Sequence, residues 1–180
     1  MAGAGGWSAK GAAGCGWRLP RALALGALLL LLLLAACGEQ RQLQLGDPAP
    51  DFTGVDQHGE TFQLSEQAGA PVVLRFWSVD CPYCRADTPV FNEYYRRHRD
   101  DGLMIVYISR TDDAEMVAEF IADLEIEFPV LMDPDDQLAD LYRVKMDPMA
   151  VFIDPEQTLT NAVLGGVGEE ELERLLGPYL

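Results

Sequence analysis

The sequence has few cysteines, few histidines and few cations. Four Cys and two His among 180 residues make a structural zinc centre hard to build, because such a centre takes about four Cys or His ligands. Lys and Arg number 13 against 29 Asp and Glu, for a formal net charge of −16. This balance argues against nucleic acid or an anionic membrane surface as a partner, since both require a basic face. The acidic surface favours solubility, and the alternative is that it steers a basic partner.

A long apolar run is also missing. The longest, residues 22–36, has 15 residues, and a helix needs roughly 20 to span a bilayer. Three cations, Lys10, Arg18 and Arg21, precede the run, and no acidic residue occurs before Glu39. A basic region followed by a short apolar region is typical of a secretory signal peptide, so we expect an exported chain.

The apolar run ends in Leu34-Ala35-Ala36-Cys37. This ending resembles the bacterial lipoprotein signal, in which the cysteine is lipidated and becomes the first residue of the mature chain. The resemblance implies a signal peptide over residues 1–36 and a lipid anchor on Cys37, which would hold the protein to a membrane on the periplasmic or cell-surface side. Gly38, in place of the aspartate that favours inner-membrane retention, points to the outer membrane. The alternatives are an ordinary signal peptide with an incidental cysteine and a retained membrane helix.

Processing of this kind would leave Cys81 and Cys84 as the only dithiol of the mature chain. In an oxidising compartment a disulfide between them can persist. Removal of residues 1–36 takes away three cations and no anion, which leaves 10 Lys and Arg against 29 Asp and Glu, or about −19 in formal charge.

The remaining pattern predicts a tether over residues 37–44 and one domain over residues 45–180. Apolar and β-branched runs predict strands, and apolar residues at three-to-four spacing predict helices. The expected strands are 72–77, 103–108, a short extended piece at 129–132 and a hairpin of 150–153 with 158–164. The expected helices run from Cys84 to about residue 99, from a capping box of Asp112 and Glu115, over 137–142 and from about residue 169. This order predicts an α/β fold with helices on both faces of a central sheet.

The segment Cys81-Pro82-Tyr83-Cys84 follows a predicted buried strand and opens a predicted helix. Unpaired N–H groups and the helix dipole stabilise an anion at a helix N-terminus, so a thiolate there has a lowered pKa and is nucleophilic. Pro82 suits the first helical turn because its missing N–H costs no hydrogen bond. We therefore expect Cys81 to attack a partner's disulfide and Cys84 to resolve the mixed disulfide.

Three other interpretations of the two cysteines compete with redox exchange. A zinc site would need further ligands, and His58 and His98 are distant in the sequence. A purely structural disulfide would close a very short loop and gain little entropy. Two inert buried thiols are the third alternative.

Several motifs together resemble the TlpA/ResA-type thioredoxin-like reductases, over essentially all of residues 45–180. They are Gly46-Asp47-Pro48-Ala49-Pro50-Asp51-Phe52, Phe76-Trp77, Cys81-Pro82-Tyr83-Cys84-Arg85-Ala86-Asp87-Thr88-Pro89, Tyr142-Arg143-Val144, Asp147-Pro148 and Phe152-Ile153-Asp154. The resemblance implies a thioredoxin-like fold with a central mixed β-sheet and extracytoplasmic thiol–disulfide exchange with protein substrates, often the reduction of disulfides in apocytochromes c. It implies no dissociable cofactor and no metal, and a membrane-embedded dithiol protein as the electron donor.

Two prolines match positions of that family. Pro148 corresponds to the cis-proline that faces the active-site sulfurs, where the preceding backbone pairs with a bound substrate strand; an X-Pro bond adopts the cis form at a cost of only about 0.5–1 kcal/mol. The alternative for Pro148 is an ordinary loop proline. Pro89 corresponds to the proline that kinks the helix after the motif, or is a local break with no catalytic role.

The sequence departs from the family at two positions near the motif. Asp80 stands where tryptophan usually precedes the first cysteine, and Arg75 stands where thioredoxins place a buried acid in the central strand. An acid beside Cys81 should raise the pKa of its thiol, whereas Arg75 or Arg85 nearby should lower it. Arg75 could instead pair with Asp80 or extend its head group to solvent. Asp80, Arg75, Pro82 and Tyr83 are therefore expected to tune the site at most.

Two other functions occur on related folds. A peroxiredoxin-like peroxidase that uses Cys81 is suggested by the opening motif and by Ser78, but Leu74 stands where the peroxidatic motif has proline, and Pro148 lies where its arginine is expected. Copper chaperones on this kind of fold have three residues between the two cysteines and a later histidine ligand. Here two residues separate the cysteines, and no histidine follows His98.

Overall fold

The computed structural model describes residues 43–111 and 113–180. Its centre is a five-stranded sheet in the order β5-β4-β3-β6-β7. Strands β3, β4 and β5 are parallel to one another, β6 pairs antiparallel with β3, and β7 pairs antiparallel with β6. The strands of this sheet are β3 (Val72–Trp77), β4 (Met104–Ser109), β5 (Val130–Met132), β6 (Met149–Ile153) and β7 (Leu159–Leu164). The sheet is therefore mixed, as predicted. The signal segment, Cys37 and all but the end of the tether lie outside the described residues.

Four α-helices and three short 3-10 turns accompany the sheet in the described part of the chain. They are α2 (Pro82–His98), α3 (Ala114–Asp123), α4 (Gln137–Leu141) and α5 (Glu169–Leu176), with η1 (Leu64–Gln67), η2 (Arg99–Asp101) and η3 (Gly177–Tyr179). A separate antiparallel pair, β1 (Thr53–Val55) and β2 (Thr61–Gln63), precedes them. Among the described residues, no helix has both the length and the apolar character needed to cross a bilayer.

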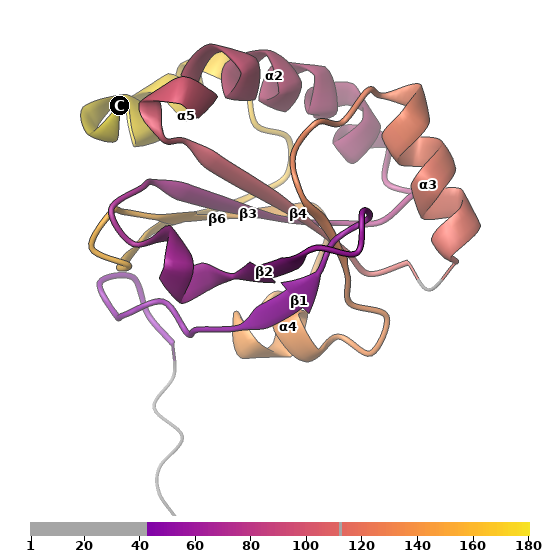
Figure 1. Cartoon of the computed structure of the whole chain (residues 1–180), viewed down its shortest axis with the longest axis horizontal. Helices are drawn as coiled ribbons and strands as arrows, with labels where there is room; N and C mark the ends of the chain where they lie inside the picture. Colours follow the sequence, from indigo (N-terminus) through magenta and orange to yellow (C-terminus); the bar gives the residue numbers. More distant parts are fainter. Residues whose placement is uncertain (1–42, 112) are drawn as a thin grey trace, which may run out of the picture. The chain divides into compact units, whose positions relative to one another are not determined.

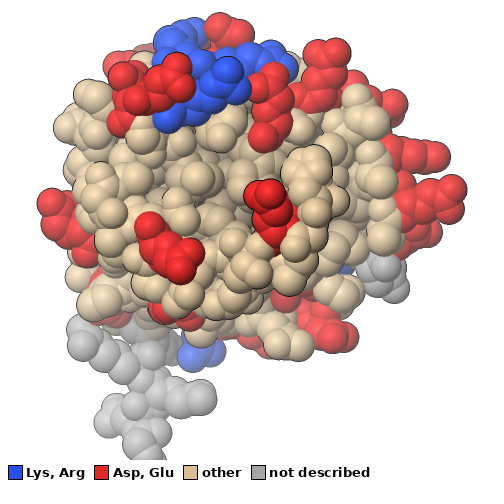
Figure 2. All heavy atoms as spheres, in the orientation of Figure 1, with Lys and Arg blue, Asp and Glu red and all other residues tan. Residues whose placement is uncertain are grey.

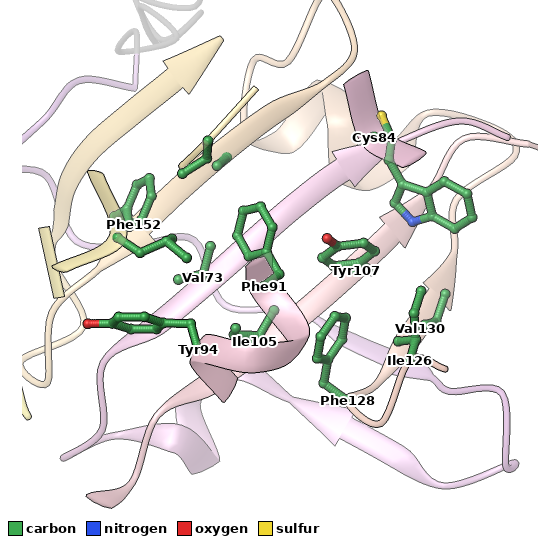
Figure 3. Close-up of a cluster of buried hydrophobic side chains, with 14 of the residues drawn as sticks. Val73, Cys84, Phe91, Tyr94, Ile105, Tyr107, Ile126, Phe128, Val130 and Phe152 are labelled. Carbon is green, nitrogen blue, oxygen red and sulfur yellow. The ribbon is translucent and has the colours of Figure 1, made fainter. Parts of the chain in front are cut away.

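The sheet has helices on both faces, which confirms the predicted α/β arrangement. Helices α2, α3 and α5 lie on one side of it, and α4 with the β1–β2 pair lies on the other (Figure 1). Two apolar cores fill the two interfaces, one of them shown in Figure 3. Alternation along β3 assigns its side chains: Val73 and Trp77 face the core under α2, whereas Val72, Leu74 and Phe76 face the opposite core.

One edge of the sheet collects the chain segments that matter for the site. The parallel strands β3, β4 and β5 end there, at Trp77, Ser109 and Met132, which lie in register. The antiparallel β6 begins there, because Met149 pairs with Phe76, and β7 ends there, because Leu164 pairs with Met149. The loops before α2, after β4, before β6 and after β7 therefore share this edge.

The start of α3 differs from the prediction. Its N-cap is Asp113, whose Oδ1 accepts hydrogen bonds from the N–H groups of Glu115 and Met116 at 3.0 and 3.1 Å. The expected capping box of Asp112 with Glu115 is therefore wrong by one residue. Along this helix Val117 and Phe120 are buried, whereas Met116 is exposed.

The cations of α2 lie among acidic residues. On the face shown in Figure 2, Lys and Arg side chains gather at the edge formed by α2, with Asp and Glu beside them. Arg96 and Arg99 pair with Glu127 at 2.7 and 3.0 Å, and Arg97 pairs with Glu169 at 2.8 Å. These arginines are therefore neutralised locally and do not form a basic surface for an anionic partner.

Candidate active site

Cys81 and Cys84 form a disulfide at the opening turn of α2. Cys81 is the N-cap residue, with extended backbone, and Pro82 is the first helical residue. The Cα atoms of the two cysteines lie 5.3 Å apart. The N–H of Cys84 donates a hydrogen bond of 3.2 Å to Sγ of Cys81. A sulfur atom therefore takes the place of the side-chain oxygen that usually accepts from the first turn of a helix.

The two sulfurs differ in their surroundings. Cys84 is 1% exposed and Cys81 is 8% exposed. In Figure 3, Cys84 lies at the end of the row of aromatic side chains that fills the core. Tyr83, between the cysteines, points to solvent, and Asp80 before them is exposed. Cys81 is therefore the cysteine with more surface accessible to a partner molecule.

The loop before β6 lies at the same edge of the sheet. The Asp147–Pro148 peptide bond is cis, which confirms the expected geometry at this position. The carbonyl oxygen of Pro148 accepts a hydrogen bond of 2.8 Å from the N–H of Gly165 in the loop after β7. Met146, on the same loop, exposes an apolar side chain. The edge thus presents the disulfide beside an exposed loop with apolar character.

Arg75 does not extend to solvent and does not pair with Asp80. It is fully buried on the face of β3 that packs under α2, where its guanidinium forms an ion pair with Asp87. Nη1 of Arg75 also donates to the carbonyl oxygen of Gly165 at 3.0 Å, and its Cζ lies 5.2 Å from the ring centre of Phe91. Two of our expectations for Arg75 were therefore wrong, because a buried charge requires a buried partner.

Asp87 is the acid that the sequence analysis missed. Its Oδ2 accepts from the N–H of Val167 at 3.0 Å as well as from Arg75, and its Oδ1 has no hydrogen-bond partner among the described residues. Burial raises the pKa of Asp87, and the positive charge of Arg75 opposes that rise. Burial likewise lowers the pKa of Arg75. One signal was available in the sequence: an arginine inside a buried strand calls for an acid on the helix that covers it.

Further contacts hold the first turns of α2. Oγ1 of Thr88 donates to the carbonyl oxygen of Cys84 at 2.6 Å and lies 3.2 Å from the hydroxyl of the buried Tyr107. Arg85 stacks over the ring of Phe120 at 4.9 Å and pairs with Asp123 at 3.4 Å. Pro89 lies inside the helix, which continues to His98. The turn that carries both cysteines is thus tied to β4 and to α3.

Replacement of Arg75 tests the buried pair. Arg75→Leu leaves Asp87 buried without a counter-charge, so we expect a loss of about 3–5 kcal/mol in the free energy of unfolding near neutral pH. Without Arg75 the pKa of Asp87 rises further above its ordinary value of 3.8. A carboxyl with a raised pKa in the folded state favours folding below its ordinary pKa and loses that effect as the pH rises through the folded pKa. The deficit relative to wild type should therefore be smallest in acid and grow with pH.

Urea unfolding of the oxidised proteins over a range of pH measures this deficit. Arg174→Leu is the matched control, because it breaks an exposed pair with Glu171 and should cost far less stability than the loss of a buried partner. A deficit for Arg75→Leu that equals the control, or that shrinks as the pH rises, would show that the pair does not carry charge in the folded protein.

Comparison with known proteins gives the family. The model of the AhpC/TSA family matches residues 45–162. The thiol-disulfide oxidoreductase ResA of Oceanobacillus iheyensis is 31% identical over 163 residues, which cover 82% of this chain and 84% of the relative; ResA of Bacillus cereus is 27% identical over 158 residues, which cover 83% and 91%.

Solved structures agree with the sequence relatives. A Chlorobium tepidum protein assigned as the thiol:disulfide interchange protein DsbE superposes with a TM-score of 0.71 at 28% identity, over 77% of this chain and 99% of that one. The thioredoxin domain of a thiol-disulfide oxidoreductase from Bacteroides vulgatus gives a TM-score of 0.67 at 25% identity, over 75% and 99%. The chain therefore belongs to the AhpC/TSA family and is a thioredoxin-fold thiol–disulfide oxidoreductase of the TlpA/ResA type.

Proposed function

We propose that this protein is an extracytoplasmic reductase of protein disulfides, in which Cys81 is the attacking thiolate, Cys84 the resolving thiol and the loop at Pro148 the place where the substrate backbone pairs. The observation that carries the proposal is the hydrogen bond from the N–H of Cys84 to Sγ of Cys81, which lies at a helix N-terminus and belongs to the more exposed of the two cysteines. A helix N-terminus stabilises a thiolate at that position.

The exchange proceeds in two steps that balance in atoms and electrons. The Cys81 thiolate attacks one sulfur of the substrate disulfide, whose S–S bond breaks and whose second sulfur leaves as a thiolate and takes up a proton. The Cys84 thiol then loses its proton and attacks Sγ of Cys81, which releases the first substrate sulfur as a thiol. The substrate gains two electrons and two protons, and the protein is left with the Cys81–Cys84 disulfide seen in the structure.

We also propose a direction of thiol–disulfide exchange, a location for the protein and its redox partners. The relatives of this chain carry the names thiol-disulfide oxidoreductase ResA and thiol:disulfide interchange protein DsbE, which supports work outside the cytoplasm. The predicted signal peptide and the lipid anchor on Cys37 would hold the protein at a membrane, with the outer membrane favoured. A membrane-embedded dithiol protein would supply the electrons, and an apocytochrome c is one candidate substrate. Asp80, Pro82, Tyr83 and Arg75 would tune the site without taking part in the bond changes.

Trapping of mixed disulfides tests the two cysteine roles. In Cys84→Ala the second step cannot occur, so Cys81 should remain covalently bound to substrate proteins. Gel electrophoresis without reductant should show bands of higher mass in cells that express the full chain, and these bands should disappear with reductant. Cys81→Ala is the matched control and should trap nothing. Trapping by Cys81→Ala alone would reverse the roles, and equal trapping by both variants would contradict distinct attacking and resolving cysteines. Rapid turnover of hydrogen peroxide by Cys84→Ala would instead support a peroxidase that uses Cys81.

The reduction potential tests the direction of exchange. A reductase should have a Cys81–Cys84 potential near that of thioredoxin, about −270 mV, and far below that of the oxidant DsbA, about −120 mV. Equilibration of the purified full chain with glutathione and dithiothreitol buffers measures it, and alkylation in cells shows which form is present. Mainly reduced thiols in cells are expected. A high potential together with a disulfide in cells would show that the protein is an oxidase.

A further inference from the structure

Arg110 follows directly after β4, at the edge of the sheet that carries the disulfide. Its guanidinium holds two carboxylates from two different loops. Nε and Nη2 donate to the two oxygens of Asp136, at 2.6 and 3.0 Å, and Nη1 donates to Oδ1 of Asp147 at 3.1 Å. Asp136 precedes α4, and Asp147 is the residue before Pro148. One side chain therefore links the end of β4 to the loop that carries Pro148.

The main chain around Arg110 contacts the other side of the site. The N–H of Arg110 donates to the carbonyl oxygen of Trp77 at 2.9 Å. Oγ1 of the next residue, Thr111, accepts from the N–H of Val79 at 3.1 Å. Trp77 and Val79 belong to the segment that leads to Cys81. Residues 110 and 111 thus fix the segment before Cys81 and the loop before Pro148 with respect to each other.

The cluster is unlike the exposed ion pairs of the surface. The side chains of Arg110 and Asp147 are 21% and 14% exposed, whereas those of the neighbouring pair Lys145 and Asp140 are 68% and 72% exposed. Hydrogen bonds from Arg110 hold the pKa of Asp136 below its ordinary value, so the carboxylate remains charged over the neutral range. Asp147 is the partly buried partner, with one contact, and Asp136, whose side chain is 45% exposed, makes the two-point contact. Burial strengthens the first pair, and the two-point contact makes the second more directional than a surface pair.

We propose that Arg110 is a positioning residue for substrate binding: through Asp147 it holds the loop of Pro148 at the distance from Cys81 that a bound polypeptide requires. This inference rests on the proposed function, because it concerns the loop where the substrate backbone would pair. Arg110 touches neither sulfur through any hydrogen bond in the described part of the chain, and it therefore acts on the binding of a polypeptide and leaves the chemistry at the sulfurs unchanged.

The inference separates two kinds of substrate. A small dithiol such as dithiothreitol attacks the Cys81–Cys84 disulfide without a polypeptide backbone, so its rate should not depend on the position of the Pro148 loop. A peptide disulfide binds along that loop, so its KM should depend on Arg110. Arg110→Gln should raise KM for a peptide disulfide by about tenfold, since charge-assisted hydrogen bonds to Asp147 and Asp136 are lost, and should leave kcat within about twofold of wild type.

The experiment uses the full chain in detergent, a synthetic peptide with one intramolecular disulfide as the probe and dithiothreitol as the electron donor. Arg110→Lys, which keeps the charge, should recover part of the loss in KM. Arg174→Gln is the matched control, because it removes an exposed cation that pairs with Glu171 on α5, and should leave KM unchanged. The rate at which dithiothreitol reduces the protein disulfide should be equal in all of these proteins.

A double-mutant cycle between Arg110 and Asp147, measured as KM for the peptide disulfide, tests the same contact even if one variant is less stable. Asp147→Ala removes the contact with Arg110 but keeps the pair of Arg110 with Asp136, so Arg110→Gln with Asp147→Ala should be no worse in KM than the worse single variant. Independent effects of the two changes, or an unchanged KM in Arg110→Gln despite a loss of stability, would overturn the positioning role. If the wild-type chain reduces no peptide disulfide at all, the proposed function fails, and that result is distinct from a failure of the role of Arg110.

Discussion

The opening turn of a helix has N–H groups that no carbonyl oxygen of the helix can accept. In this protein the N–H of Cys84 finds its acceptor in the sulfur of Cys81, and Pro82 contributes no N–H to the same turn. The position that satisfies the backbone is also the position where a negative charge on sulfur is most stable. One hydrogen bond thus contributes both to the start of the helix and to the stability of a thiolate on Cys81. The rest of the domain keeps this turn at the edge where β3 ends, next to the loop of Pro148.

Two arginines brace that edge by different means. Arg75 pairs with Asp87 in the core under α2 and contacts the loop after β7 through Gly165. Arg110 lies nearer the surface and holds the loop before β6 through Asp147. Because the N–H of Gly165 also donates to the carbonyl oxygen of Pro148, Arg75 is linked to the Pro148 loop through Gly165, whereas Arg110 contacts that loop directly. The core pair therefore bears on stability, and the outer cluster bears on the geometry that a substrate meets.

Most of the elements could be predicted from the sequence, since buried strands and amphipathic helices have distinct periods. β3 runs from Val72 to Trp77 as expected, and α5 begins at Glu169 as expected. The cap of α3 was misplaced by one residue because Asp112 and Asp113 are adjacent and an aspartate at either position can cap a helix; the structure has Asp113 as the cap. Alternation in β3 places Arg75 on the face under α2, but which acid of α2 lies opposite depends on how the helix packs on the sheet. The contact of Arg110 with Asp147 was not foreseen because it joins loops whose paths depend on the whole fold.

The measurement that tests the central claim most directly is the pH dependence of alkylation of the reduced protein by iodoacetamide, with the modified cysteine identified by mass spectrometry. A free cysteine thiol titrates near about 8.5. If the opening turn of α2 stabilises a thiolate, Cys81 should be modified first and its rate should reach half its maximum at least about one pH unit below that value. Equal modification of Cys81 and Cys84, or a midpoint at or above that of a free thiol, would contradict the account.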